Sequence, residues 1–368
     1  MNTQEILSKF MYPPPGSNIR TKALPLYHNL TIAAATISYP AFTPDVAYAV
    51  SNIKLPLSGT QMFCNTGLRL RVPSLDGISV AELGALLFNC YLTLFINERL
   101  QVKLPLAEFI NLPNQMIEAT AQTVSLPGAQ PVRRTFAGSS LGLNKSAWGF
   151  PYFFNSNSKV TVTIELTTAV ATFLDGAVIT LILDGWLADK LDDVTFQEIS
   201  QGDMFQTMKD SIWQTSTYQS GVAGVDFLQS APSQYTGNNY FPLSNINNAQ
   251  IEAIELGIAT DKDFATVENA LATSFLTMML NDVLIFEQNL LDMTSIFVTG
   301  SGVFTDSGAA TTAYSLQAVK RKILILQTPI LIPPLAKVIT QITFATSAGL
   351  DTNPLLLDLQ ITGQRRIT

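Results

Sequence analysis

One pattern occurs twice in this chain, 184 positions apart. The first copy is Leu92-Thr-Leu-Phe-Ile-Asn-Glu-Arg-Leu-Gln-Val-Lys-Leu-Pro-Leu106, and the second is Leu276-Thr-Met-Met-Leu-Asn-Asp-Val-Leu-Ile-Phe-Glu-Gln-Asn-Leu290. In both copies a short Asn-acid step separates two apolar runs, which is typical of a β-hairpin with a polar tip. The residues of the first copy that find identical partners are Leu92, Thr93, Asn97, Leu100 and Leu106. We therefore expect the same hairpin in each half of the chain.

A second set of matches follows at an offset of 178. Lys159-Val160 matches Lys337-Val338, and the further matches join Ile164, Thr168, Leu181 and Gly185 with Ile342, Thr346, Leu359 and Gly363. The two blocks keep their order, and the long intervals between them vary as loops on one rim of a sandwich do. The 368 residues also exceed the roughly 250 to 300 at which a single core stops growing. Order and length together predict two similar domains in tandem.

Most other segments have the character of strands: five to eight β-branched and aromatic residues bounded by Gly, Pro, Asn or Asp. The segment Lys159-Val-Thr-Val-Thr-Ile-Glu165 alternates cleanly, so its three apolar side chains should share one buried face. Helical periodicity is confined to Asn2 to Met11 and Asp203 to Gln214. A parallel α/β fold is therefore excluded, because a helix should then follow nearly every strand.

The predicted fold class is all-β, with two tandem antiparallel jelly-roll β-sandwiches of eight strands each. We expect a short N-terminal helix or arm at residues 1–16 and the first jelly roll at 17–188. A linker that contains the second helix should occupy 189–221, and the second jelly roll 222–368.

The composition is apolar for a protein without a membrane span. Hydrophobic residues make up 47% and charged residues 13% of the chain, against about 25% charged in ordinary globular proteins. No uninterrupted apolar run reaches the roughly 18 residues of a membrane helix. Few charges therefore indicate a surface that is largely covered by other protein. The net charge of −7 argues against a broad phosphate-binding surface and against sequence-specific binding of nucleic acid.

The sequence predicts no catalytic, cofactor-binding or metal site. Cys64 and Cys90 have no metal-ligand spacing and are expected in the core, and one histidine, His28, cannot complete a zinc site. Gly138-Ser-Ser-Leu-Gly142 fits the G-x-S-x-G motif, but no helix and no later histidine follow it. The acidic residues Asp189, Asp192 and Asp193 lack the glycine turn of a calcium loop, so we expect a solvated linker there.

Two β-sandwiches of this size, whose last strands end in Leu183-Asp-Gly-Trp186 and Ile361-Thr-Gly-Gln364, resemble the double jelly-roll major capsid proteins. That family of tailless icosahedral viruses includes the coats of tectiviruses, corticoviruses and adenoviruses. The resemblance implies a virion shell protein, made in the host cytoplasm, whose homotrimers form pseudo-hexameric tiles. Implied partners are neighbouring capsomers, minor capsid or vertex proteins and an internal membrane under the shell, and a bacteriophage is the expected source. The intervals Asn111 to Pro151 and Thr294 to Arg321 would then form outward towers.

In several members of that family an N-terminal helix lies beneath the shell. Here Ile6, Leu7, Phe10 and Met11 would be the assembly-facing or membrane-facing side chains. A plain terminal helix packed on its own domain is the competing interpretation. Two other functions stay open at this stage. One is a carbohydrate-binding or receptor-binding spike or vertex protein with aromatic residues such as Tyr235, Tyr240 and Phe241, and the other is a glycosidase on a β-sandwich.

Overall fold

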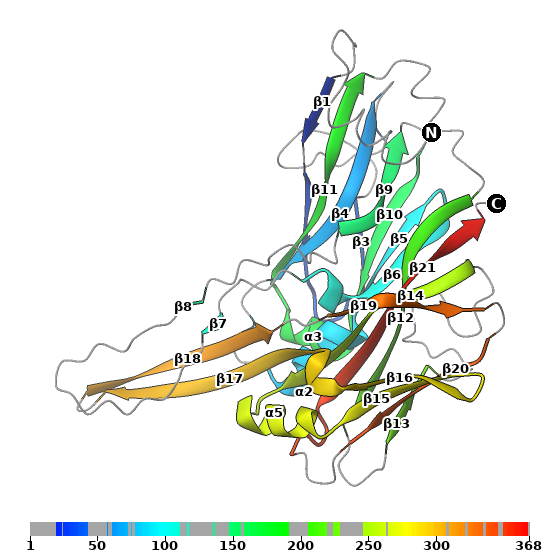
Figure 1. Cartoon of the computed structure of the whole chain (residues 1–368). Coiled ribbons are helices and arrows are strands. Elements are labelled where there is room, and N and C mark those ends of the chain that lie inside the picture. The colour runs from blue at the N-terminus through cyan, green and yellow to red at the C-terminus, as the bar shows by residue number, and fades with distance from the viewer. Residues whose placement is uncertain are drawn as a thin grey trace.

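The computed structural model describes residues 20–23, 25–42, 57, 61–72, 75, 78–110, 116–117, 135–136, 147–155, 158–190, 205–218, 224–228, 246–262, 264–306, 309–320, 323–333, 336–344 and 349–366. We call 20–190 the first half and 205–366 the second half. Strands dominate both halves, and most of them pair antiparallel (Figure 1). The expected all-β class is therefore confirmed, with short helices at the ends of strands.

The first half contains two sheets. One has the order β1-β11-β4-β9, with β2 also paired to β11, and the other has the order β3-β10-β5-β6. Their bounds are β1 Arg20–Ala23, β2 Leu26–Thr31, β11 Val178–Lys190, β4 Met62–Arg71, β9 Ala147–Asn155, β3 Ser38–Ala41, β10 Val160–Glu165, β5 Tyr91–Ile96 and β6 Arg99–Pro105.

The second half repeats this order. Its sheets are β12-β21-β14, with β19 paired to β14, and β13-β20-β15-β16. Their bounds are β12 Phe205–Thr217, β21 Pro354–Arg366, β14 Ile246–Thr260, β19 Leu324–Ile332, β13 Val225–Phe227, β20 Val338–Thr343, β15 Phe275–Leu280 and β16 Val283–Asn289. In the second half β17 (Thr294–Asp306) also pairs parallel with β14 and then forms a hairpin with β18 (Ala309–Lys320), and at the corresponding place in the first half an isolated parallel bridge joins Leu70 and Ile110.

Short helices join the strands at matching places. The described ones are α2 Val80–Gly84, the π-helix η1 Ala85–Asn89, the 3-10 turn η2 Leu106–Glu108 and α3 Thr168–Phe173 in the first half, and α5 Phe264–Ala272 and the 3-10 turn η3 Leu290–Asp292 in the second. Each of these helices, among the residues described, is too short or too polar to cross a bilayer.

The repeated hairpin is confirmed at atomic detail. Asn97 and Asn281 both adopt positive φ, 51° and 48°, as do the acidic residues that follow them, which is the geometry of a two-residue type I′ turn. Asn97 Oδ1 accepts from the backbone N–H of Lys159 at 2.9 Å, and Asn281 Oδ1 accepts from that of Lys337 at 3.0 Å. Each tip is thus fastened to the strand that begins after the lysine, β10 or β20.

The same tips carry an ion pair across each turn. Lys159 Nζ lies 2.7 Å from Glu98, and Lys337 Nζ lies 3.8 Å from Asp282. All four groups are exposed, so water and salt screen each pair and it adds little to stability. Because the same ion pair occurs at both tips, the two hairpins correspond residue by residue.

Each half has a large apolar core, which lies between its two sheets. The strand β10 shows the expected alternation, because Val160, Val162 and Ile164 are buried and the residues between them are half-buried. Both cores therefore follow from strands with one inward face, as the sequence predicted.

The prediction of a helix between Asp203 and Gln214 is wrong. This segment forms β12, which pairs with β21 along its whole length. Ile212 points into the second core, while its neighbour Trp213 is buried in the first core. A strand covered on both faces shows no simple alternation, so the apolar residues of this segment imitated a helical stripe.

The two expected towers differ in what the structure describes of them. Most of 111–151 lies outside the described residues, apart from the short strands β7 (Met116–Ile117) and β8 (Thr135–Phe136) and the start of β9. In the second half β17 and β18 form a long hairpin that extends far from both sheets (Figure 1). The predicted N-terminal helix, with Ile6, Leu7, Phe10 and Met11, lies outside the described residues.

Candidate functional site at the junction of the two halves

Apolar side chains from both halves meet at one junction within the described residues. Trp213, Ala259, Phe297 and Leu356 of the second half belong to the core cluster of the first half. The ring of Phe88, at the end of η1, meets that of Phe297 edge-on with centroids 5.9 Å apart. The halves are therefore joined by a buried apolar contact of the kind found inside domains.

Close backbone approach accompanies this contact. A Cβ placed on Gly84 would lie 2.2 Å from Cγ of Pro354, and one placed on Gly257 would lie 3.1 Å from the Phe88 ring. These two glycines let α2 and η1 of the first half lie directly on β14 and β21 of the second. The outer face of the second half's larger sheet is thus covered by the first half.

Trp213 also ties the junction by a hydrogen bond. Its Nε1–H donates to the backbone oxygen of Lys103 in β6 at 3.1 Å, and its side chain is fully buried. A buried indole usually finds such a partner. The edge strand β6 of the first half is thereby held against β12 of the second.

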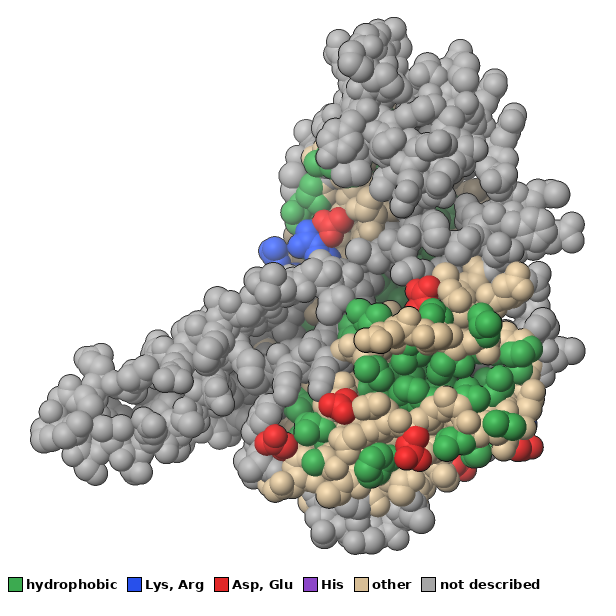
Figure 2. Space-filling model, viewed as in Figure 1, with side chains coloured by type: hydrophobic (Ala, Val, Ile, Leu, Met, Phe, Trp, Pro, Cys, Tyr) green, Lys and Arg blue, Asp and Glu red, His purple; other side chains and the backbone are tan. Residues whose placement is uncertain are grey.

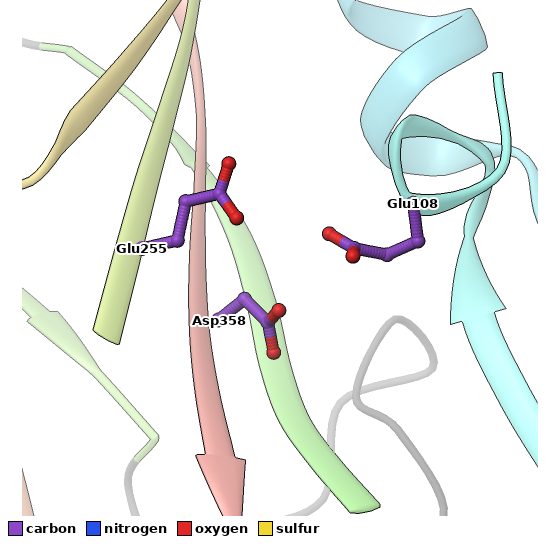
Figure 3. A group of neighbouring side chains, drawn as sticks. All are labelled: Glu108, Glu255 and Asp358. Carbon is purple, nitrogen blue, oxygen red and sulfur yellow. The ribbon is translucent and has the colours of Figure 1, made fainter. Parts of the chain in front are cut away.

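Three carboxyl groups lie inside this junction, at Glu108, Glu255 and Asp358 (Figure 3). Glu108 comes from η2 of the first half, and the other two come from adjacent positions of β14 and β21. One oxygen of each lies within 4.8 Å of the others, and exposed fractions are 5%, 3% and 0%. Ser295 donates its hydroxyl to Glu255 at 2.6 Å.

Such a cluster needs compensation for its charge. Three ionised carboxylates at this spacing would repel each other strongly where water is excluded. Protons shared between the groups, or a cation held by their oxygens, would each relieve this repulsion. The stability of the junction therefore depends on how the charge of these three carboxyl groups is compensated.

Sequence reasoning missed these three residues, although a signal was present. Asp358 interrupts the apolar run Leu355–Leu359, and Glu255 interrupts the shorter apolar run Ala253–Ile258. A lone acid within a buried strand is rare unless it has a partner. The partners lie 103 to 250 positions apart in the chain, so their meeting could not be seen in the sequence.

Of the residues singled out in the sequence, those that the structure describes form no common site. Cys64 and Cys90 are buried, and burial raises the pKa of each thiol to about 12. His28 accepts a hydrogen bond at Nδ1 from the N–H of Phe42 at 2.9 Å, and burial lowers its pKa. The following lie outside the described residues: Ser140, Asp192, Asp193, Tyr235, Tyr240 and Phe241, and of Asp189 only the backbone is described.

The first half has a surface that corresponds to the covered face of the second half. The correspondence is fixed by one hydrogen bond in each half: Leu70 N–H donates to Phe109 O, and Leu256 N–H donates to Met293 O. Both sheets also have a bulge at the same place, after Asp184 in one and after Gln360 in the other. Leu181 therefore corresponds to Leu357, which corrects the sequence match of Leu181 to Leu359 by two positions.

In this correspondence Arg69 occupies the position of Glu255, and Ile182 that of Asp358. Arg69 binds Asp184 through two hydrogen bonds, of 2.5 and 2.6 Å. That carboxylate raises the pKa of Arg69 above its usual value. Both side chains are about 30% exposed (29% and 31%), so this ion pair is open to a further partner.

Exposed apolar side chains gather on the second half, where Figure 2 shows an apolar patch bordered by polar surface and several acidic side chains. They come mainly from its edge strands β16 and β19: Val283, Leu284, Ile325 and Leu331, each more than half exposed. Edge strands with such side chains are surfaces on which another chain can pack.

No protein-family model matches the sequence, and no curated protein matches it. Among solved structures, the Faustovirus major capsid protein is similar at 8% identity and a TM-score of 0.30, over 96% of this chain and 91% of that one. A structure of PNGF-II is similar at 12% identity and a TM-score of 0.28, over 96% of this chain and 66% of that one. A structure of infectious bursal disease virus has 10% identity and a TM-score of 0.14, over 100% and 84%. Likenesses this weak carry no argument about function.

Proposed function

We propose that this chain is a structural major capsid protein built from two tandem jelly rolls. In a jelly roll, eight strands form two four-stranded sheets in which the first strand neighbours the last. The described sheets follow this order in both halves, since β1 and β2 neighbour β11, and β12 neighbours β21. In this proposal the second jelly roll would begin near residue 205 and not at the expected 222, because β12 would take the place of its first strand.

The observation that carries the proposal is the repeat of both the sheets and the hairpin tips within one chain. A duplicated jelly roll lets three copies present six similar domains around an axis, which suits a tile in a hexagonal lattice. The low charge and the apolar edge of the second half support extensive contacts with other protein. The role is structural and not enzymatic in this proposal.

The wider assignments rest on the family resemblance. They are a homotrimeric, pseudo-hexameric capsomer in the shell of an icosahedral virion, a bacteriophage source, and contacts with neighbouring capsomers and minor vertex proteins. The segment with Ile6, Leu7, Phe10 and Met11 would lie under the shell, against neighbours or an internal membrane. The long hairpin of β17 and β18 would be a tower on the outer surface.

The test is the mass of the purified, undenatured chain by light scattering, with electron microscopy of the same sample. A trimer of three 40.0 kDa chains, or closed shells, is the expected result. A stable monomer at micromolar concentration would contradict the proposal. Screening that monomer against glycans would then test the spike function.

A further inference from the structure

We propose that the second half of one copy docks on the first half of the next copy, so that Asp292 meets Arg69. This contact deepens the proposed function and rests on it, because it names the surfaces by which capsid subunits would associate. It is derived by applying the junction observed within the chain to the next copy.

The junction joins two different surfaces, and each half carries both. The first half contributes α2, η1, β6 and η2, which cover the outer face of the sheet with β12, β21 and β14. The counterparts of the covering elements are α5, β16 and η3 of the second half. The counterpart of the covered face is the outer face of β2, β11 and β4 in the first half. A contact between unlike surfaces propagates from copy to copy, and it forms a ring if the rotation closes.

Charges at the corresponding positions favour this contact. Glu108 is the last residue of η2, and Asp292 is the last residue of η3. Within the chain Glu108 approaches Glu255, whose counterpart is Arg69. Between copies the same geometry would therefore place the exposed Asp292 beside a guanidinium, where the intrachain junction places acid beside acid. Arg69 already binds Asp184, so its guanidinium would be shared between two carboxylates, an attraction that is missing where acid lies beside acid.

A second position agrees in chemistry. Trp213 pairs with Asp358 in the sheet, and Tyr27 pairs with Ile182, so these two aromatic residues correspond. Trp213 donates to the backbone oxygen of Lys103, and the counterpart of Lys103 in the repeated hairpin is Glu287. The hydroxyl of the half-buried Tyr27 would correspondingly donate a hydrogen bond to the backbone oxygen of Glu287 in the neighbouring copy.

Side-chain size is exchanged across the proposed contact. In the junction the large ring of Phe88 packs on Gly257. Counting from the hairpin places the small, exposed Ala272 at the position of Phe88, and the backbone correspondence places the exposed Arg71 at that of Gly257. Within the chain a large ring packs on a glycine, whereas between copies a small alanine would pack on a large arginine. The space at the contact would be filled in both cases.

The exposed apolar residues lie where this model needs them. β16 and β19 correspond to β6 and β9, which both contact β12 in the junction. Val283, Leu284, Ile325 and Leu331 are therefore on the side of the second half that would be covered by the next copy.

The experiment is a cross-link between Arg69→Cys and Asp292→Cys, placed together in the full-length chain, with a bis-maleimide reagent, because it is the ends of the side chains that would meet and not the Cβ atoms that a disulfide requires. The native Cys64 and Cys90 are buried, so only the new thiols should react with the reagent. Non-reducing gels should show covalent dimer and closed trimer, while either single variant should stay uncross-linked. A second double variant, Val178→Cys with Asp292→Cys, is the control, because Val178 is exposed on the same sheet but lies away from Arg69.

A charge reversal gives an independent reading that leaves the Arg69 ion pair intact. Asp292→Arg should weaken association at least about tenfold in sedimentation experiments, since it places like charges together. Asp226→Arg is the matched control, because Asp226 is exposed on β13, at the opposite edge of the sheet from β16. It should associate as the wild type does.

The outcomes separate this contact from the proposed function. Trimers that form no cross-link between the two positions, and that tolerate Asp292→Arg as they tolerate Asp226→Arg, would overturn the contact alone. A wild-type chain that remains monomeric would overturn both. Cross-linked trimers that Asp292→Arg dissociates would support both.

Discussion

Replacing Gly84 by alanine tests whether the junction really brings α2 onto the second half. Gly84 has helical dihedrals, φ −60° and ψ −41°, so alanine fits the backbone without strain. In a free helix the change should stabilise the protein by about 0.4 to 1 kcal/mol. Here the new Cβ would lie 2.2 Å from Cγ and 2.5 Å from Cβ of Pro354, and a proline ring cannot turn away.

The clash should outweigh the helix term. Overpacking costs about 1 to 3 kcal/mol, and a contact of 2.2 Å with a ring carbon places this case at about 2 to 3 kcal/mol. After the helix gain of about 0.4 to 1 kcal/mol is subtracted, Gly84→Ala should lower the free energy of unfolding by about 1 to 2.6 kcal/mol. Urea unfolding followed by circular dichroism measures this change. Ala81→Gly, at an exposed position of the same helix, calibrates the helix term and should cost about 0.5 to 1 kcal/mol.

A double-mutant cycle isolates the contact. Pro354→Gly removes both ring atoms that the new Cβ would meet, so Gly84→Ala should be tolerated better in that background. The coupling energy should equal the clash, about 2 to 3 kcal/mol, because the helix gain is present in both backgrounds and cancels. If Gly84→Ala instead raised stability in the wild-type background, as in an isolated helix, the close packing of α2 on β21 would be refuted.

Four further predictions concern the junction and the buried titratable groups. Trp213→Ala should cost about 3 to 5 kcal/mol and separate calorimetric unfolding into two transitions; a single transition would show that the halves stay coupled without the indole. Glu108→Gln removes one of three crowded charges and should leave the melting temperature unchanged or raise it, whereas a large drop would mean that the carboxylate is needed. Cys64 and Cys90 should ignore a thiol reagent at pH 8 and both react in denaturant; because their pKa is raised from 9.0 to about 12, their burial should also reduce stability progressively from pH 9 upward. His28 has a lowered pKa, so the unfolded chain binds its proton more readily, and stability should fall as the pH drops below about 6.5; His28→Phe should lose this part of the pH profile.

Several parts of the fold could be predicted because their causes are local. The Asn-acid tips adopt positive φ for reasons of their own side chains, and two flanking apolar runs close on such a turn. The alternation of β10 follows from a strand with one inward face. Both signals need fewer than fifteen neighbouring residues, and both were read correctly.

The segment of β12 shows where local reasoning failed. Met204, Phe205, Met208 and Ile212 fit a helical stripe, but the partner that decided the conformation was β21, more than 130 positions away. Cross-strand pairing and burial on both faces outweighed the periodicity of the segment. The sequence match of the last strands, β11 and β21, was wrong by two positions for a similar reason. Their register is set by a bulge that forms only when each strand pairs with a distant partner.

The amino-acid sequence by itself determined that this protein is built mainly of strands and that one hairpin occurs twice, because turn chemistry and alternation act between near neighbours. Only the tertiary structure decided that β12 is a strand, that Glu108, Glu255 and Asp358 meet, and that Trp213 belongs to the core of the other half. Those features depend on contacts between residues more than a hundred positions apart, whose energies are gained only when the two halves pack together.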